Sequence, residues 1–175
     1  LVSQFSKGSW ETVWALIDGN LGTGNFGPLI QRLEPEYAYI SNRNPAVIPS
    51  SMTLIVAIAL GFYLFLKVKI REPIGEISLL GLTFTIFFLW SPGWSPQWIL
   101  YLIPIILLSL SGHRGFLYSS LLICINLLEW PLLLSKGYGH LIVFPILLRT
   151  IIFILLTIEF YQLIKPRCHQ EVIEG

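Results

Sequence analysis

Residues 141–164 read LIVFPILLRTIIFILLTIEFYQLI, an almost unbroken apolar stretch in which only Arg149 and Glu159 carry charge. The hydrocarbon core of a bilayer is about 30 Å thick, and roughly 20 helical residues cross it. A strand of a membrane barrel would alternate apolar and polar side chains, and this stretch shows no such alternation. Because lipid cannot hydrogen-bond to an open backbone, the stretch is predicted to be a transmembrane α-helix.

The same apolar character extends over most of the chain's 175 residues. Hydrophobic residues make up 54% of the chain and charged residues 12%, whereas a soluble domain carries about 25% charged residues. The net charge of +1 gives no reason to expect a nucleic-acid partner, and two cysteines cannot form a disulfide framework. We therefore predict an all-α polytopic transmembrane helix bundle of about five spans, at residues 49–66, 74–90, 98–111, 117–134 and 141–164.

Three regions follow from this division of the chain. Residues 1–48 are polar and rich in turn-forming residues, residues 49–164 form the predicted bundle, and residues 165–175 form a polar tail. The chain begins at Leu1, and its methionine, Met52, stands at the start of an apolar run. We therefore expect the chain to be the C-terminal part of a longer polytopic protein.

Basic residues alternate between the connections of the predicted spans. The 67–72 connection holds three of them and the 112–116 connection holds Arg114, whereas the 91–97 connection holds none. Cytoplasmic loops are enriched in lysine and arginine, so the C-terminal tail is expected in the cytoplasm. The expected extracytoplasmic segments are residues 1–48, 91–97 and 135–140.

The second and third spans are separated by Ser-Pro-Gly-Trp-Ser-Pro-Gln at residues 91–97. Two serine–proline steps and a glycine end a helix. Either both segments cross the membrane, or they form two half-helices that re-enter the same face. We favour two crossings, because short helices can cross a thinned or protein-lined region of the bilayer.

Residues 9–18, Ser-Trp-Glu-Thr-Val-Trp-Ala-Leu-Ile-Asp, have a helical period that gathers two tryptophans and two aliphatic residues on one face. Ser9 is expected to cap this helix and Gly19 to end it. Tryptophan favours the headgroup layer, so an interfacial amphipathic helix is predicted. The helix either lies on the membrane surface without a further role, or covers a site at which a lipid-linked substrate enters.

Residues 22–27, Gly-Thr-Gly-Asn-Phe-Gly, have the spacing of the dinucleotide-binding fingerprint. That fingerprint follows a buried strand and opens a helix. Here a predicted helix precedes the glycines and Pro28 follows them. A turn-rich loop is therefore expected at this position, and no nucleotide site.

Glu129 and Arg149 are charged residues at membrane depth in the last two predicted spans. Charges at that depth are costly and usually face the protein interior or a water-filled cavity. Because the two spans run antiparallel, the depths of the two residues differ by about 5 Å. Either the two side chains pair, or Arg149 faces a cavity and holds a phosphate through its planar guanidinium. Glu159 is expected to reach the cytoplasmic interface.

Gln97 stands between Pro96 and Trp98 at the outer start of the third predicted span. It marks either the start of a helix with an interfacial aromatic residue, or a polar side chain at the rim of a cavity. The three histidines of the chain lie far apart and show no metal-ligand spacing, so no metal site is predicted.

Two stretches carry a family resemblance. The first, at residues 8–19, is Gly-Ser-Trp-Glu-Thr-Val-Trp-Ala-Leu-Ile-Asp-Gly, which follows Gln4 and Lys7, and the second, at residues 95–104, is Ser-Pro-Gln-Trp-Ile-Leu-Tyr-Leu-Ile-Pro. Together they resemble the C-terminal half of GT-C-type integral-membrane glycosyltransferases, in particular bacterial and archaeal members related to the polyprenyl-phosphate mannosyltransferases. In that family a basic-Gly-x-x-Glu-Ser/Thr-like stretch lies in an extracytoplasmic loop, and Ser-Pro-Gln-aromatic begins a late helix.

The resemblance implies transfer of a hexose, such as mannose, from a polyprenyl-phosphate donor to an acceptor outside the cytoplasm, in the plasma membrane of a prokaryote. The acceptor hydroxyl attacks the anomeric carbon while the lipid phosphate leaves, which requires an acidic base and cationic groups at the phosphate. The family's acidic residue lies in an earlier extracytoplasmic loop, so the base is expected upstream of Leu1 and this chain alone is expected to be inactive.

The same resemblance places four substrate contacts in this chain, and the charge of Arg149 at membrane depth adds a fifth. Lys7 stands where the family has an arginine. No cofactor is implied, and neither the resemblance nor the residue pattern indicates a divalent metal. The expected substrate-binding residues are Lys7, Glu11, Gln97, Trp98 and Arg149.

Other classes of function remain open on the sequence. The chain is alternatively half of a transporter or lipid flippase with Glu129 and Arg149 along its path, although it shows no internal repeat. It is otherwise a non-catalytic membrane assembly subunit. The lipid bilayer is the partner common to all three.

Overall fold

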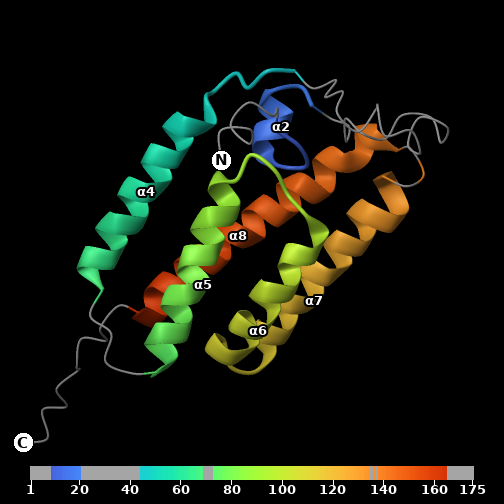
Figure 1. Cartoon of the computed structure of the whole chain (residues 1–175). Coiled ribbons are helices and arrows are strands. Elements are labelled where there is room, and N and C mark those ends of the chain that lie inside the picture. Colours follow the sequence, from blue (N-terminus) through green and yellow to red (C-terminus); the bar gives the residue numbers. More distant parts are fainter. Residues whose placement is uncertain (1–8, 21–43, 69–72, 135, 137, 165–175) are drawn as a thin grey trace, which may run out of the picture.

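The computed structural model describes residues 9–20, 44–68, 73–134, 136 and 138–164. Within these residues the regular elements are helices, joined by an isolated parallel bridge between Trp10 and Gly93. Successive long helices run in opposite directions and pack into a bundle (Figure 1). The predicted all-α helix bundle is confirmed. The elements are α2 (Val13–Ile17), α4 (Ser50–Lys67), α5 (Pro73–Trp90), η2 (Pro96–Trp98), α6 (Ile99–Ser109), α7 (His113–Leu127), η3 (Leu128–Leu134), η4 (Gly139–Ile142) and α8 (Val143–Ile164).

Four of the predicted spans are long and apolar enough to cross a membrane. They are Ser50–Lys67, Pro73–Trp90, His113–Leu134 and His140–Ile164. The third predicted span, 98–111, is the shorter helix Pro96–Ser109, which rises about 22 Å. Since α5 has spanning length by itself, it favours two crossings, and the choice between crossings and re-entrant half-helices stays a prediction.

The centre of the bundle is the contact of α8 with α5. Leu82 of α5, Leu102 and Ile106 of α6, and Leu156 and Phe160 of α8 are almost completely buried in one apolar core. Gly81 allows α5 to approach α8 closely, because a Cβ added there would lie 2.6 Å from the Phe160 ring. The outward faces of the same helices remain apolar and exposed, as lipid contact requires.

Helix α4 stands apart from this core. None of its residues is buried, and a groove of about 570 Å³ separates it from α5. The groove is apolar and is lined by Leu54, Gly61 and Phe65 on one side and by Leu82 and Ile86 on the other. Helix α4 is held to the bundle near its two ends: the Trp90 indole donates to the Ser50 carbonyl at 3.2 Å, and Leu64 packs against the core.

The fourth predicted span is one continuous helical segment although it contains Pro131. Helix α7 passes directly into a π-helical segment, η3, which holds Glu129, Trp130 and Pro131. Proline lacks the N–H that would bond one turn back and its ring crowds that turn. A wider π-helical turn accommodates it without ending the helix.

The predicted interfacial helix at residues 9–18 is wrong in extent and in its N-cap. The helix α2 covers Val13–Ile17, and its N-cap residue is Thr12 rather than Ser9. Glu11 adopts a φ of 54°, which a right-handed helix cannot include. The predicted stop is confirmed, because Gly19 has a φ of 73° directly after the C-cap residue Asp18. We call residues 9–20 the cap.

The cap lies at one end of the bundle, together with two of its connections (Figure 1). It contacts the 91–95 connection through the bridge to Gly93, and Leu16 packs against Leu134 and Ile142 at the α7–α8 connection. At the opposite end Arg114 pairs with Glu159 at 3.6 Å. The described residues of the segments expected on one side of the membrane thus share the cap end, and Glu159 lies at the other end. Which end faces the cytoplasm stays a prediction.

We predict that a methyl group at Gly81 destabilises the bundle whereas one at Gly61 does not. Gly81→Ala forces Phe160 to shift, at a cost of about 1–3 kcal/mol, while a Cβ at Gly61 meets nothing within 4 Å. Thermal unfolding of both variants in detergent measures the difference. Equal midpoints for the two variants would contradict the packing described for α5 and α8.

We also predict that the two ends of the bundle are labelled from opposite sides of the membrane. In a cysteine-free background Gln97→Cys reports on the cap end and His113→Cys on the other end, and both positions are exposed. A membrane-impermeant maleimide added to intact cells should modify Gln97→Cys and reach His113→Cys after permeabilisation. Modification of both before permeabilisation would refute the arrangement.

Candidate functional site

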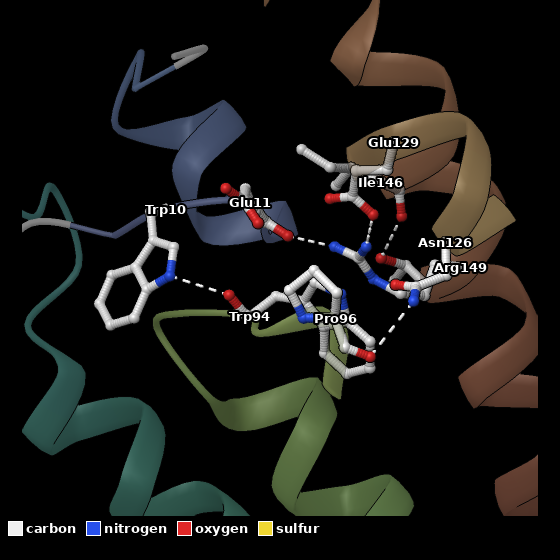
Figure 2. A network of polar contacts seen from close by, with 9 residues as sticks. Trp10, Glu11, Trp94, Pro96, Asn126, Glu129, Ile146 and Arg149 are labelled. Atoms are coloured by element: carbon white, nitrogen blue, oxygen red, sulfur yellow. Dashed lines mark hydrogen bonds and ion pairs between the residues drawn. The ribbon is translucent and has the colours of Figure 1, made fainter. Parts of the chain in front are cut away.

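The cap docks on the 91–95 connection through its main chain. The Trp10 N–H donates to the Pro92 carbonyl at 3.0 Å, and the Trp94 N–H donates to the Trp10 carbonyl at 3.2 Å. A Cβ at Gly93 would lie 2.1 Å from the Trp10 ring, so this approach requires glycine. The Trp10 indole also donates to the Trp94 carbonyl at 2.9 Å (Figure 2).

Two further side chains of the cap bond to carbonyl groups, one in the last turn of α5 and one just beyond the helix. The Trp14 indole donates to the Leu89 carbonyl at 3.0 Å, and the Thr12 hydroxyl donates to the Pro92 carbonyl at 3.2 Å. The last carbonyls of a helix lack partners within the helix. Both predicted interfacial tryptophans therefore bond to the bundle, so the helix does not lie free on the membrane surface.

Polar contacts also join the cap to the segment before α4. The Asp18 carboxylate accepts from the Ser9 hydroxyl and, at 2.8 Å, from the Val47 N–H. The side-chain amide of Asn20 bonds to both main-chain groups of Asn44, at 2.8 and 3.2 Å. These bonds fix the start of α4 relative to the cap, and Asp18 and Asn20 were not predicted as site residues.

Arg149 is the charged centre of the cap end. Its guanidinium pairs with the Glu129 carboxylate, donates to the Glu11 carbonyl and lies 4.4 Å from the Trp94 ring (Figure 2). The exposed fractions of the Arg149 and Glu129 side chains are 4% and 0%. The predicted alternative of an Arg149–Glu129 ion pair is confirmed, and phosphate binding by Arg149 stays a prediction.

The local backbone explains why these groups meet. The left-handed conformation of Glu11 directs its carbonyl group to Arg149. Glu129 lies in the π-helical turn of the fourth span. Three residues earlier, the Asn126 side chain donates to the Pro96 carbonyl at 3.2 Å and joins α7 to the 91–97 connection. Buried charges are stable when they are paired and hydrogen-bonded, as they are here.

The remaining predicted site residues differ in their exposure and do not all lie together. Gln97 is exposed in η2. Trp98 is half-buried and stacks on Phe88, with ring centroids 5.8 Å apart. Glu11 is buried and contacts Arg149, whereas Lys7 and the glycines at 22–27 lie outside the described residues.

Sequence reasoning did not identify Trp94 and Asn126 as members of this site. Asn126 carried a usable signal, because it is a polar residue in an apolar span, one helical turn before Glu129. Trp94 carried a weaker signal, because a tryptophan between prolines at a membrane surface is as well explained by the headgroup layer.

With the cap docked, there is little space beneath it. A cavity of about 10 Å³ lies between Thr12, Phe88, Trp94 and Arg149, which is room for about one water molecule. Within the described part of the chain, no three histidine, cysteine or acidic side chains come together as metal ligands. The docked arrangement therefore closes off Arg149 from any ligand the size of a sugar or a phosphate.

Comparisons with protein-family models, with curated proteins and with solved structures gave no match for this chain.

We predict strong energetic coupling between Arg149 and Glu129. Arg149→Met or Glu129→Leu alone leaves one buried charge unpaired, at a cost of about 3–5 kcal/mol. The double variant removes both charges and should be less destabilised than the sum of the singles by about 0.5–3 kcal/mol. Reversible unfolding in detergent of all four proteins completes the cycle. Additive costs would show that the contact contributes nothing specific.

Proposed function

We propose that this chain is the C-terminal membrane part of a GT-C-type glycosyltransferase, which transfers a hexose such as mannose from a polyprenyl-phosphate donor to an acceptor on the extracytoplasmic side. The observation that supports the proposal best is that the cap docks on residues 92–94, directly before the second stretch that carries the resemblance. Residues 8–19 and 95–104 are distant in sequence, yet the cap docks directly beside the start of η2 through Trp10 and Gly93.

In this proposal the cap end is the extracytoplasmic face of a prokaryotic plasma membrane. Gln97 is exposed at that end, where its amide can contact a bound donor or acceptor, and the neighbouring Trp98 ring is held by Phe88. Lys7 supplies a cation close to the cap in sequence. The attack of the acceptor hydroxyl needs a general base, which the resemblance assigns to an earlier loop of the full-length protein.

Two of the proposed substrate-binding residues have roles within the protein when the cap is docked. Arg149 is paired with Glu129, and Glu11 contributes its carbonyl group to the same cluster. With the cap in this position, Arg149 and Glu11 hold the cap and η3 together beneath the proposed substrate-binding surface. We therefore propose that Gln97 and Trp98, rather than Arg149 and Glu11, contact the donor directly when the cap is docked.

The proposal predicts that Gln97→Ala in the full-length protein lowers turnover of a polyprenyl-phosphate-linked hexose about tenfold, the effect of one lost hydrogen bond in the transition state. The matched control is Gln162→Ala, an exposed glutamine near the opposite end of α8. Reconstituted protein and a radiolabelled donor give the rates. Wild-type turnover by Gln97→Ala would remove this residue from the site, and solute or lipid flux without sugar transfer would favour the transporter alternative.

A further inference from the structure

We infer that the cap, residues 9–20, is a lid that opens and closes over Arg149, and that the Arg149–Glu129 pair is the latch that holds it closed. This inference does not depend on the proposed function. It rests on three observations. Arg149 bonds to both Glu129 and the cap, most other cap contacts are hydrogen bonds, and several buried polar atoms near Arg149 have no hydrogen-bond partner when the cap is docked.

The Arg149 guanidinium bonds both to the helix bundle and to the cap. One of its nitrogens bonds to Glu129 of η3, and the other bonds to the main-chain carbonyl of Glu11 in the cap. Glu129 therefore fixes the direction of the guanidinium, and the guanidinium fixes the cap. Figure 2 shows the Arg149 side chain reaching from α8 to both partners.

The other contacts of the cap are of a kind that water can replace. Within residues 9–20 the buried apolar residue is Ala15, while Leu16 is half-buried and Ile17 is 46% exposed. Apart from the Leu16 contact with Leu134 and Ile142 and the Trp10 ring beside Gly93, the docking surface consists of hydrogen bonds. They join the cap to residues 89–94 and to Asn44 and Val47. Segments with few buried apolar contacts are the ones that open locally.

The closed arrangement also carries costs that opening relieves. Among the described residues, three buried polar atoms near the guanidinium have no hydrogen-bond partner: Trp94 Nε1, Asn126 Oδ1 and Glu129 Oε1. Unsatisfied buried groups favour an arrangement in which water reaches them. Glu11 in addition holds a left-handed backbone, which is strained for a residue with a side chain.

The latch and the bundle can be separated by experiment, because the double variant Arg149→Met/Glu129→Leu removes the donor to the Glu11 carbonyl together with the charge partner of Arg149 in η3. The assay is the rate at which a water-soluble maleimide modifies Ala15→Cys, which is 0% exposed, in the cysteine-free full-length protein purified in detergent, where both ends of the bundle are open to the reagent. Ser119→Cys, in the core of α7 and 5% exposed, reports on the bundle.

We expect slow but measurable modification of Ala15→Cys in the otherwise unaltered protein and none of Ser119→Cys. The double variant should raise the Ala15→Cys rate about tenfold, as expected for the loss of a charge-assisted hydrogen bond, and leave Ser119→Cys unmodified. Gly93→Ala should raise the Ala15→Cys rate with the ion pair intact, because the added Cβ displaces the Trp10 ring. Gly61→Ala is the matched control and should change nothing.

Three results would overturn the inference. If Ala15→Cys is never modified in the otherwise unaltered protein, the cap is fixed and is no lid. A double variant that keeps the unaltered rate would show that Arg149 does not hold the cap. Modification of Ser119→Cys in the double variant would show that the pair holds the bundle together instead.

Discussion

A guanidinium at membrane depth needs hydrogen-bond partners within the protein, because lipid provides none. Arg149 meets this constraint with a carboxylate from η3, a main-chain carbonyl from the cap and an aromatic ring from the 91–95 connection. The three partners come from parts of the chain far apart in sequence. Several local features serve this one cluster, among them the π-helical turn around Glu129 and the left-handed Glu11.

The rest of the cap end is organised by a second requirement of the same kind, the pairing of main-chain groups where helices stop. The end of α5 exposes carbonyl groups, and the Trp14 indole bonds to one of them, that of Leu89. Thr12 bonds to the Pro92 carbonyl just beyond the helix. On its other side the cap bonds to residues 44–47 before α4. The cap therefore connects the core helices to α4, which has no buried residue of its own.

The docked cap limits access to Arg149. The space under the docked cap holds about one water molecule, so a sugar or a phosphate meets the exposed Gln97 before it meets Arg149. The proposed lid over Arg149 and the proposed transferase site lie on the same face, because the cap docks on residues 92–94 and the exposed Gln97 follows directly. The groove of about 570 Å³ between α4 and α5 opens instead between two apolar helices.

The sequence by itself determined the helix bundle, four of its spanning helices, the stop of α2 at Gly19 and the similar depth of Glu129 and Arg149. These features follow from local properties: apolar length, glycine conformation and the rise of a helix. The sequence did not determine that residues 9–12 leave the helical period, because the bridge to Gly93 outweighs the local helix preference of a short segment. It also left open whether Arg149 pairs with Glu129. Only the tertiary structure decided that, because the partners of a buried charge are set by which distant segments pack around it.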